Sequence, residues 1–200
     1  MDEQLEKPKG GKKGAIIAVI ALAIVIAAAV FVYQALPDIQ AGMPYELTPD
    51  GAISQEDTDS LFACEIERFD GAKSTIKDIS EASGKPIVIN MWASWCTHCE
   101  AEMNAYQQLF EEYGDRIEFV MLDIPDSKSE YDAAKKYVEE HGFTFTAYYD
   151  TDMRVTTTLN VIGIPVLVII SPAGDVVLNR TGEVNYNALK GTFDNVLRLG

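Results

Sequence analysis

The hydrophobic pattern of the chain begins with a long apolar run near its start. Residues 15–33 read AIIAVIALAIVIAAAVFVY and carry no charged side chain. As a helix rising 1.5 Å per residue, the run spans about 28 Å, close to the roughly 30 Å hydrocarbon core of a bilayer. Lysines precede it within residues 1–14, which places that segment in the cytoplasm by the positive-inside rule. The pattern predicts one transmembrane helix over residues 15–36, with everything after it outside the cytoplasm.

A cleaved signal peptide is the alternative interpretation of this run. The run is longer than the usual ~7–15 apolar residues of such a peptide, and no strong small-x-small cleavage site follows it directly. IQA, residues 39–41, is a weak candidate site. We therefore expect an uncleaved anchor. Residues 37–60 have no sustained period and are rich in proline, glycine and acids, which predicts a flexible linker.

Strand-like patterns recur from residue 61 onward. In LFACEIE, residues 61–67, apolar residues alternate with acids, as in a half-buried strand. KPIVINMW, residues 85–92, is a continuous apolar run and predicts a strand at the buried centre of a sheet. Further strands are predicted over residues 116–124 and 143–150, and a hairpin over residues 164–182.

Helical patterns fill the gaps between these strands. One helix is expected after the cysteines, where Met103, Tyr106, Phe110 and Tyr113 recur at helical spacing. Another is expected over residues 127–142, beginning with a capping box of Ser127 and Glu130. A short irregular helix over residues 151–161 and a closing helix over residues 185–199 complete the set. Strand–helix units with a terminal hairpin indicate an α/β sheet covered on both faces.

Composition narrows the class of protein. The chain has 200 residues, 48% of them hydrophobic, which suffices for one packed domain plus extra segments. Its net charge of -15 argues against a nucleic-acid partner, because phosphate backbones repel it.

Cysteine spacing carries the chemistry. Cys96-Thr97-His98-Cys99 follows the buried strand and opens a helix, so Cys96 lies where unpaired N–H groups and the helix dipole favour a thiolate. Cys99 is about one turn on, within reach for a disulfide. Cys96 can then attack a substrate disulfide, and Cys99 can resolve the mixed disulfide.

Two other interpretations of the cysteine pair compete with redox chemistry. Half of a zinc site is one, but no second ligand pair with suitable spacing follows. A purely structural disulfide is the other, although so short a loop constrains the unfolded chain little. The remaining cysteine, Cys64, is expected to be a buried free thiol in the strand over residues 61–67.

Two motifs, NMWASWCTHC and GIPVLVII, resemble the thioredoxin superfamily. The segment between them, residues 129–165, is similar to the insertion of the membrane-anchored TlpA/ResA-like branch. The resemblance covers residues 61–200. It implies a thioredoxin-like central mixed sheet flanked by helices, with a TlpA-type insertion, after the N-terminal transmembrane helix.

The resemblance also implies roles for single residues. Cys96 is the nucleophile, Cys99 the resolving thiol, and Cys96–Cys99 the redox-active disulfide. Pro165, preceded by Ile164, matches the cis-proline that faces the cysteines and helps to hold substrate; the alternative is an ordinary proline at a strand start. Trp95 matches the tryptophan beside the nucleophile.

Glu102 matches a glutamate of the ResA-like branch. Thioredoxin itself has a buried aspartate where this chain has Asn90. Glu102 lies three residues after Cys99, on roughly the same helical face. If buried, it has a raised pKa and can accept the proton of Cys99. The alternative is a solvated helix glutamate, like Glu100.

Two positions depart from the family pattern. His98 stands where proline is frequent, and a histidine there can stabilise the Cys96 thiolate and make the disulfide more oxidising. Asn104 stands where many members have a helix-kinking proline, so the helix is expected to be straighter.

The sequence therefore predicts a membrane-anchored, extracytoplasmic thiol-disulfide oxidoreductase without cofactor or metal. The anchor, the insertion and Glu102 favour a reductase of exported proteins. In the family, one such role is the reduction of apocytochrome c, with electrons from a membrane carrier of the CcdA/DsbD type. An oxidase or isomerase, supported by His98, is the alternative. A module that delivers metal through Cys96, Cys99 and a histidine is less favoured.

Overall fold

A computed structural model describes residues 12–41, 43–48 and 52–199. It divides the chain into two units, Met1–Ala41 and Gly42–Gly200. In the first unit, a helix α1 covers Lys12–Ala41, and most of the predicted cytoplasmic segment lies outside the described residues. Among the described residues, no helix is both long enough and apolar enough to cross a membrane.

The second unit is built on one mixed sheet of seven strands, counted over the described residues, in the order β2-β1-β5-β4-β3-β6-β7. The strands are β1 Glu65–Arg68, β2 Lys73–Thr75, β3 Ile87–Trp92, β4 Glu118–Asp123, β5 Ala147–Tyr149, β6 Val166–Ile170 and β7 Val176–Thr181. Strands β3, β4 and β5 run parallel, whereas β6 is antiparallel to both β3 and β7. The expected thioredoxin-like mixed sheet is confirmed.

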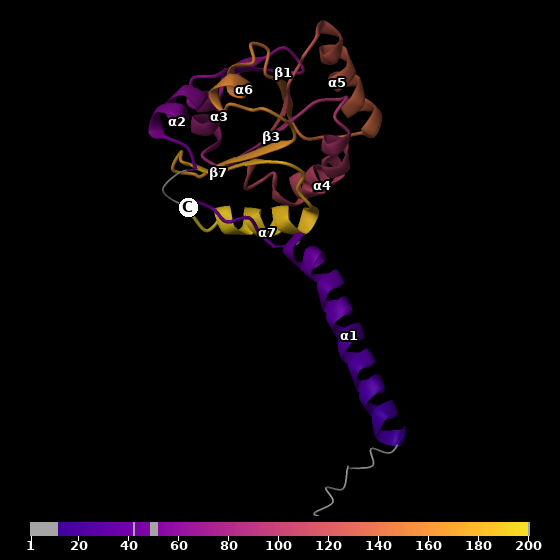
Figure 1. The fold of residues 1–200 in the computed structure, drawn as a ribbon. Coiled ribbons are helices and arrows are strands. Elements are labelled where there is room, and N and C mark those ends of the chain that lie inside the picture. Colours follow the sequence, from indigo (N-terminus) through magenta and orange to yellow (C-terminus); the bar gives the residue numbers. More distant parts are fainter. Residues whose placement is uncertain (1–11, 42, 49–51, 200) are drawn as a thin grey trace, which may run out of the picture. The chain divides into compact units, whose positions relative to one another are not determined.

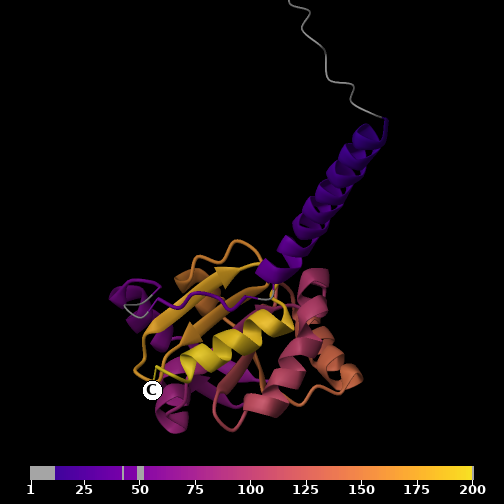
Figure 2. The same ribbon diagram turned by 90° about the horizontal axis from the view of Figure 1, so that it is seen from below.

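Helices cover both faces of this sheet. They are α2 Gln55–Phe62, α3 Ile76–Ser83, α4 Thr97–Tyr113, α5 Lys128–His141, α6 Arg154–Thr158 and α7 Tyr186–Val196. One buried cluster joins the sheet to α4, α5 and α7, and a second joins its other face to α2, α3 and α6. Figure 1 shows α2, α3 and α6 grouped on one side of the sheet and α7 on the other. Figure 2 shows α4 and α7 side by side.

The central strands follow directly from their sequence. All six residues of β3 are buried, as a continuous apolar run at a sheet centre predicts. The predicted strands over residues 116–124 and 143–150 and the hairpin over residues 164–182 correspond to β4, β5, β6 and β7. The helices expected between and after them are α4 to α7.

The segment before the sheet differs from the sequence prediction. Where a flexible linker was expected over residues 37–60, residues 43–48 run against the domain: the Thr48 N–H donates to the Val177 carbonyl at 2.8 Å. The Tyr45 N–H donates to Thr192 Oγ1, also at 2.8 Å. Strand β7 is the sheet edge, and its open backbone groups accept such an extended segment whatever its sequence period.

The start of the domain also differs. Residues 61–67 are not a single strand, because α2 ends at Phe62 and β1 begins at Glu65. Cys64 lies between them; it is buried and free, as expected. Strand β2 and helix α3 follow β1, and sequence analysis missed the capping box of Thr75 and Asp78 at the start of α3.

Candidate active site

The cysteine pair lies at the carboxyl end of the central strand. Strand β3 ends at Trp92, a tight loop follows, and α4 begins at Thr97. Cys96 and Cys99 form a disulfide with 5.2 Å between their Cα atoms. Cys96 is the N-cap of α4, and the Cys99 N–H donates to its Sγ at 3.2 Å. Cys96 is 6% exposed and Cys99 0%, so the first sulfur is the one nearer to solvent.

The proline loop lies beside this disulfide. The peptide bond between Ile164 and Pro165 is cis. The Ile164 carbonyl oxygen is 4.0 Å from Cys96 Sγ. Val166, the first residue of β6, pairs with Met91 of β3, and this register brings the loop to the end of β3 where the cysteines lie. The sequence predicts Pro165 at the site, and in the structure the loop that carries Pro165 lies beside the disulfide.

His98 does not point at the sulfur of Cys96. Its side chain is 76% exposed, and its Nδ1 contacts the carboxylate of Glu183. Because α4 starts at Thr97, His98 lies in the first turn with its side chain toward solvent. The predicted stabilisation of a Cys96 thiolate by His98 has no direct contact to support it. Trp95, in contrast, is exposed beside the cysteines, where a docked substrate can reach it.

The connection between β7 and α7 joins three parts of the site. The Gly182 N–H donates to the Pro165 carbonyl at 2.9 Å. Glu183 contacts His98, and the Val184 N–H donates to Glu102 Oε2 at 3.0 Å. Sequence analysis missed this connection. The usable signal was Gly182 at the end of a strand, and its φ of 103° is one that favours glycine.

A cavity of about 390 Å³ opens next to the disulfide. It is lined by His98, Ile164, Pro165, Gly182 and Glu183. Its wall thus combines the apolar surface of Ile164 and Pro165 with the His98–Glu183 pair.

Glu102 is buried, at 2% exposure. Burial raises its pKa to about 8, the neighbouring Glu183 charge adds to the rise, and the Val184 N–H opposes it. The alternative of a solvated glutamate is thereby excluded in this structure. A carboxyl group with this pKa holds its proton near neutral pH and can release it within the same range.

Further buried polar groups surround Glu102. Asn90 and Tyr106 are both fully buried, and burial raises the pKa of Tyr106 well above its usual range. Asn90 Nδ2 lies 3.9 Å from the Met103 sulfur. Among the described residues, Asn90 Oδ1, Glu102 Oε1 and the Tyr106 hydroxyl have no hydrogen-bond partner. Polar side chains therefore extend from the buried cysteine into the core under α4.

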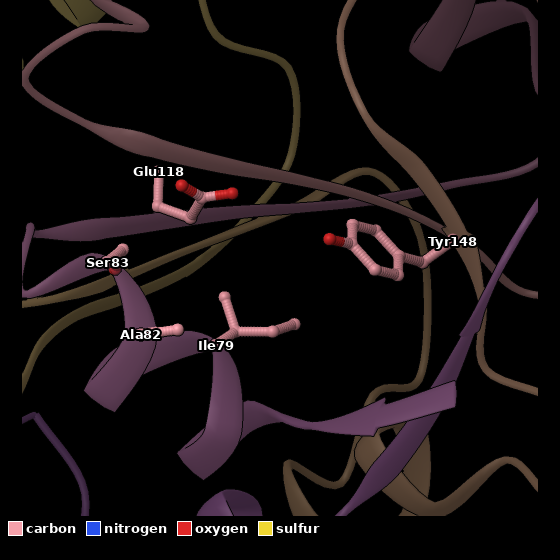
Figure 3. A pocket seen from close by; sticks show the side chains of 5 residues that line it. All are labelled: Ile79, Ala82, Ser83, Glu118 and Tyr148. Carbon is pink, nitrogen blue, oxygen red and sulfur yellow. The ribbon is translucent and has the colours of Figure 1, made fainter. Parts of the chain in front are cut away.

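A second cavity, of about 240 Å³, lies against α3 on the other face of the sheet. It is lined by Ile79, Ala82, Ser83, Glu118 and Tyr148. Figure 3 shows the Glu118 carboxylate and the Tyr148 hydroxyl turned toward the same space above Ile79. Glu118 begins β4, whereas the cysteines follow the carboxyl end of the parallel strand β3, so this cavity is separate from the redox site.

The arrangement supports dithiol–disulfide exchange. It provides a disulfide at a helix N-terminus, an open groove beside it and a buried carboxyl group that can hold a proton. No cluster of three or more potential metal-ligating side chains occurs within residues 12–41, 43–48 and 52–199.

Comparison with known proteins agrees with this geometry. The family model described as AhpC/TSA matches residues 59–179. The thiol-disulfide oxidoreductase ResA of Bacillus thuringiensis (strain Al Hakam) is 29% identical over 132 residues, which cover 66% of this chain and 73% of that protein. ResA of Bacillus subtilis (strain 168) is 27% identical over 124 residues, or 62% and 67% of the two chains. The recognised similarity to ResA is confirmed.

Solved structures share the fold. DsbF of Mycobacterium tuberculosis superposes with a TM-score of 0.60 at 23% identity, covering 68% of this chain and 97% of that chain. A secreted disulfide oxidoreductase of the same organism, described as homologous to E. coli DsbE, gives a TM-score of 0.57 at 23% identity, over 71% and 99%. At this identity they establish the thioredoxin-like architecture.

Proposed function

Because the chain belongs to the AhpC/TSA family and is a thiol-disulfide oxidoreductase of the ResA type, we propose that it reduces disulfides of exported proteins. The observation that carries the proposal is Glu102, a buried carboxyl group three residues after Cys99 on the same helix. A reductase must load and unload a proton at its buried thiol in every cycle, and Glu102 is placed to exchange it.

The reaction transfers two electrons and two protons. In the dithiol form, the Cys96 thiolate attacks one sulfur of the substrate disulfide, the substrate S–S bond breaks, and the departing thiolate takes up a proton. Cys99 then passes its proton to the Glu102 carboxylate and attacks Cys96 Sγ. The mixed disulfide breaks, the second substrate thiolate leaves and is protonated, and the Cys96–Cys99 disulfide of the present structure remains.

Resetting the site reverses these steps. A dithiol donor attacks Cys96 Sγ, the more accessible of the two sulfurs, and the Cys96–Cys99 bond breaks. The second thiol of the donor then breaks the mixed disulfide, which leaves the donor oxidised and Cys96 reduced. Glu102, whose pKa of about 8 keeps it protonated near neutral pH, returns the proton to Cys99. We propose a membrane thiol carrier of the CcdA/DsbD type as the donor and exported proteins, with apocytochrome c among them, as the substrates.

The direction of electron flow separates this proposal from an oxidase or isomerase. His98 was the reason to consider an oxidase, because it can stabilise the thiolate of the reduced form. Its contact with Glu183 instead of the sulfur favours the reductase.

Attachment to a membrane is a separate proposal, carried by the sequence. The run over residues 15–33 has no charge, and α1 carries exposed isoleucines such as Ile16, Ile17 and Ile20. Such a run needs a lipid or protein surface to cover it. Alkaline carbonate extraction of membranes from cells that produce the full chain tests it: an anchored chain stays in the pellet, and release into the supernatant contradicts the proposal.

Substitution of each cysteine tests the chemistry. Cys96→Ala in the full chain should abolish reduction of insulin disulfides, whereas Cys99→Ala should accumulate mixed disulfides with exported proteins. Cys64→Ala is the matched control and should keep activity, because Cys64 is buried away from the pair. Trapping by Cys96→Ala instead of Cys99→Ala would reverse the assigned roles.

The reduction potential tests the direction. A value near the roughly -270 mV of thioredoxin supports the reductase, and a value near the roughly -120 mV of DsbA supports an oxidase. Equilibration of the full chain with glutathione or dithiothreitol buffers, followed by thiol counting at Cys96 and Cys99, measures it.

A further inference from the structure

The side chain of Glu130, a residue of α5, binds the loop that carries Cys96. The sequence suggested a capping box at the start of α5, but the structure contradicts it, because the N-cap Ser127 makes no side-chain cap bond. Glu130 instead accepts the Ser94 N–H at 2.5 Å with Oε1 and the Ser94 hydroxyl at 2.9 Å with Oε2. Ser94 lies two residues before Cys96. Glu130 is 4% exposed, and both of its carboxylate oxygens thus accept hydrogen bonds from the loop that carries Cys96.

A second buried carboxyl group, Asp123, lies close enough to Glu130 for their charges to interact. Asp123 ends β4, is 0% exposed, and stands in register with Trp92 at the end of β3. Within the described part of the chain, neither of its carboxyl oxygens has a hydrogen-bond partner. The end of β4 therefore places an acid beside the acid that holds the loop.

No cation balances these two acids among the described residues, since neither takes part in an ion pair. The pKa of Asp123 is raised to about 9, first by burial and then by the neighbouring charge of Glu130. Other titratable groups around it are Asp126 before α5, Tyr131 on α5 and Tyr149 on β5, none of them positive. Two buried carboxylates side by side cannot both ionise without a large cost.

We propose that Glu130 is a positioning residue for the Cys96 loop and that Glu130 and Asp123 hold one proton between them while it binds Ser94. A proton on Asp123 removes a second buried charge from beside the Glu130 carboxyl group, whose two oxygens accept hydrogen bonds from Ser94. The proposal rests on the disulfide chemistry assigned to Cys96, and it adds a second buried acid site, separate from Glu102.

The consequence concerns the geometry of the nucleophile. The Cys96 N–H donates to the Ala93 carbonyl at 3.1 Å, so Ser94 lies within the turn that sets the N-cap position of Cys96. Anchoring Ser94 fixes this turn. When the shared proton leaves at alkaline pH, the second buried charge weakens the Glu130–Ser94 hydrogen bonds. Disulfide exchange at Cys96 should then slow.

Amide hydrogen exchange at Ser94 in the full chain tests the anchor without relying on activity. Glu130→Ala should speed exchange of the Ser94 amide by at least about tenfold, the equivalent of one lost hydrogen bond to a charged group. Glu130→Gln, which keeps an oxygen acceptor, should restore slow exchange, and Glu139→Gln, an exposed change on the same helix, should have no effect. Equal Ser94 exchange in Glu130→Ala and the wild type would overturn the positioning role.

The pH profile of single-turnover insulin reduction tests the shared proton. Each reduction rate is divided by the rate of the same protein at about pH 7.5. The wild-type ratio should fall several-fold by about pH 10. In Asp123→Asn the ratio should not fall, because asparagine cannot ionise. Superimposed wild-type and Asp123→Asn profiles overturn the shared proton. If the wild type does not reduce insulin, the proposed function fails, and a carboxyl 13C titration of Asp123 decides the point instead: ionisation near its ordinary pKa overturns the proposal.

Discussion

The two buried acid sites beside the active-site helix differ in what shares the space with the carboxyl group. Glu102 belongs to α4 itself, accepts one backbone N–H from Val184, and has amide and phenol neighbours. Glu130 reaches the redox loop from α5 and has a second acid, Asp123, beside it. Burial raises the pKa of Glu102 and of Asp123 alike. At both sites desolvation raises the pKa of a carboxyl group, so that it holds a proton. The neighbouring groups decide whether that proton is exchanged with a thiol or shared with a second carboxyl group.

Stability against pH should show both sites most strongly. The folded pKa of Glu102, about 8, and that of Asp123, about 9, are raised above their ordinary values, so stability is greatest below those ordinary values and is lost as pH rises toward the folded ones. Each group costs about 1.4 kcal/mol per pH unit inside its window.

Urea unfolding of the oxidised protein from about pH 5 to about pH 9 measures this loss. Glu102→Gln and Asp123→Asn should each flatten the profile and make the protein more stable than the wild type at the alkaline end. A profile that Glu102→Gln leaves unchanged would show that Glu102 ionises normally in the folded state, and the comparison of two proton sites would then collapse to one.

Glu102→Gln should separate the catalytic consequences of the two sites. The amide keeps the shape of the side chain but cannot transfer a proton, so reductive turnover near neutral pH should slow by about 10²-fold. Glu100→Gln, an exposed change in the same helix, is the matched control. Stopped-flow single turnovers as a function of pH give the comparison, and coincident profiles for Glu102→Gln and the control remove Glu102 from the mechanism.

Ser94→Ala should sharpen the other side of the comparison. It removes one of the two hydrogen bonds to the Glu130 carboxylate and keeps the backbone N–H, so unfolding free energy should fall by about 1.5–3 kcal/mol. Ser129→Ala, on the exposed start of α5, should change it by less than about 0.5 kcal/mol. Equal stabilities for the two variants would mean that Glu130 contributes nothing through the Ser94 hydroxyl.

His98→Pro should have the smallest effect. Loss of the histidine should make the protein more reducing. The observed contact of His98 is a solvent-exposed pair with Glu183, and such pairs are worth about 0–1 kcal/mol. At about 30 mV per 1.4 kcal/mol, the shift should stay below roughly 30 mV. A larger shift, measured in a glutathione buffer, would mean that His98 reaches the Cys96 thiolate in the reduced form and would revive the oxidase alternative.

Local patterns determined much of the molecule. The apolar run of β3, the helical spacing in α4 and the hairpin of β6 and β7 are set by neighbours along the chain, so sequence reasoning found them. The same holds for Cys96 at a helix start and for Cys64 as a buried free thiol. The fold class and Pro165 came from motifs in a fixed order along the chain, and a resemblance can carry these without any knowledge of packing.

Tertiary structure decided which polar groups meet. Burial of Glu102 depends on α7 and its preceding loop, more than 80 residues away, and sequence could only leave the burial open. His98 contacts Glu183 and not the Cys96 sulfur, and residues 43–48 hydrogen-bond to the edge strand β7. Glu130 binds Ser94 and does not form the predicted capping box. In each case a contact with a distant segment decided the outcome, through the free energies of desolvation and hydrogen bonding. A local sequence period does not encode such contacts.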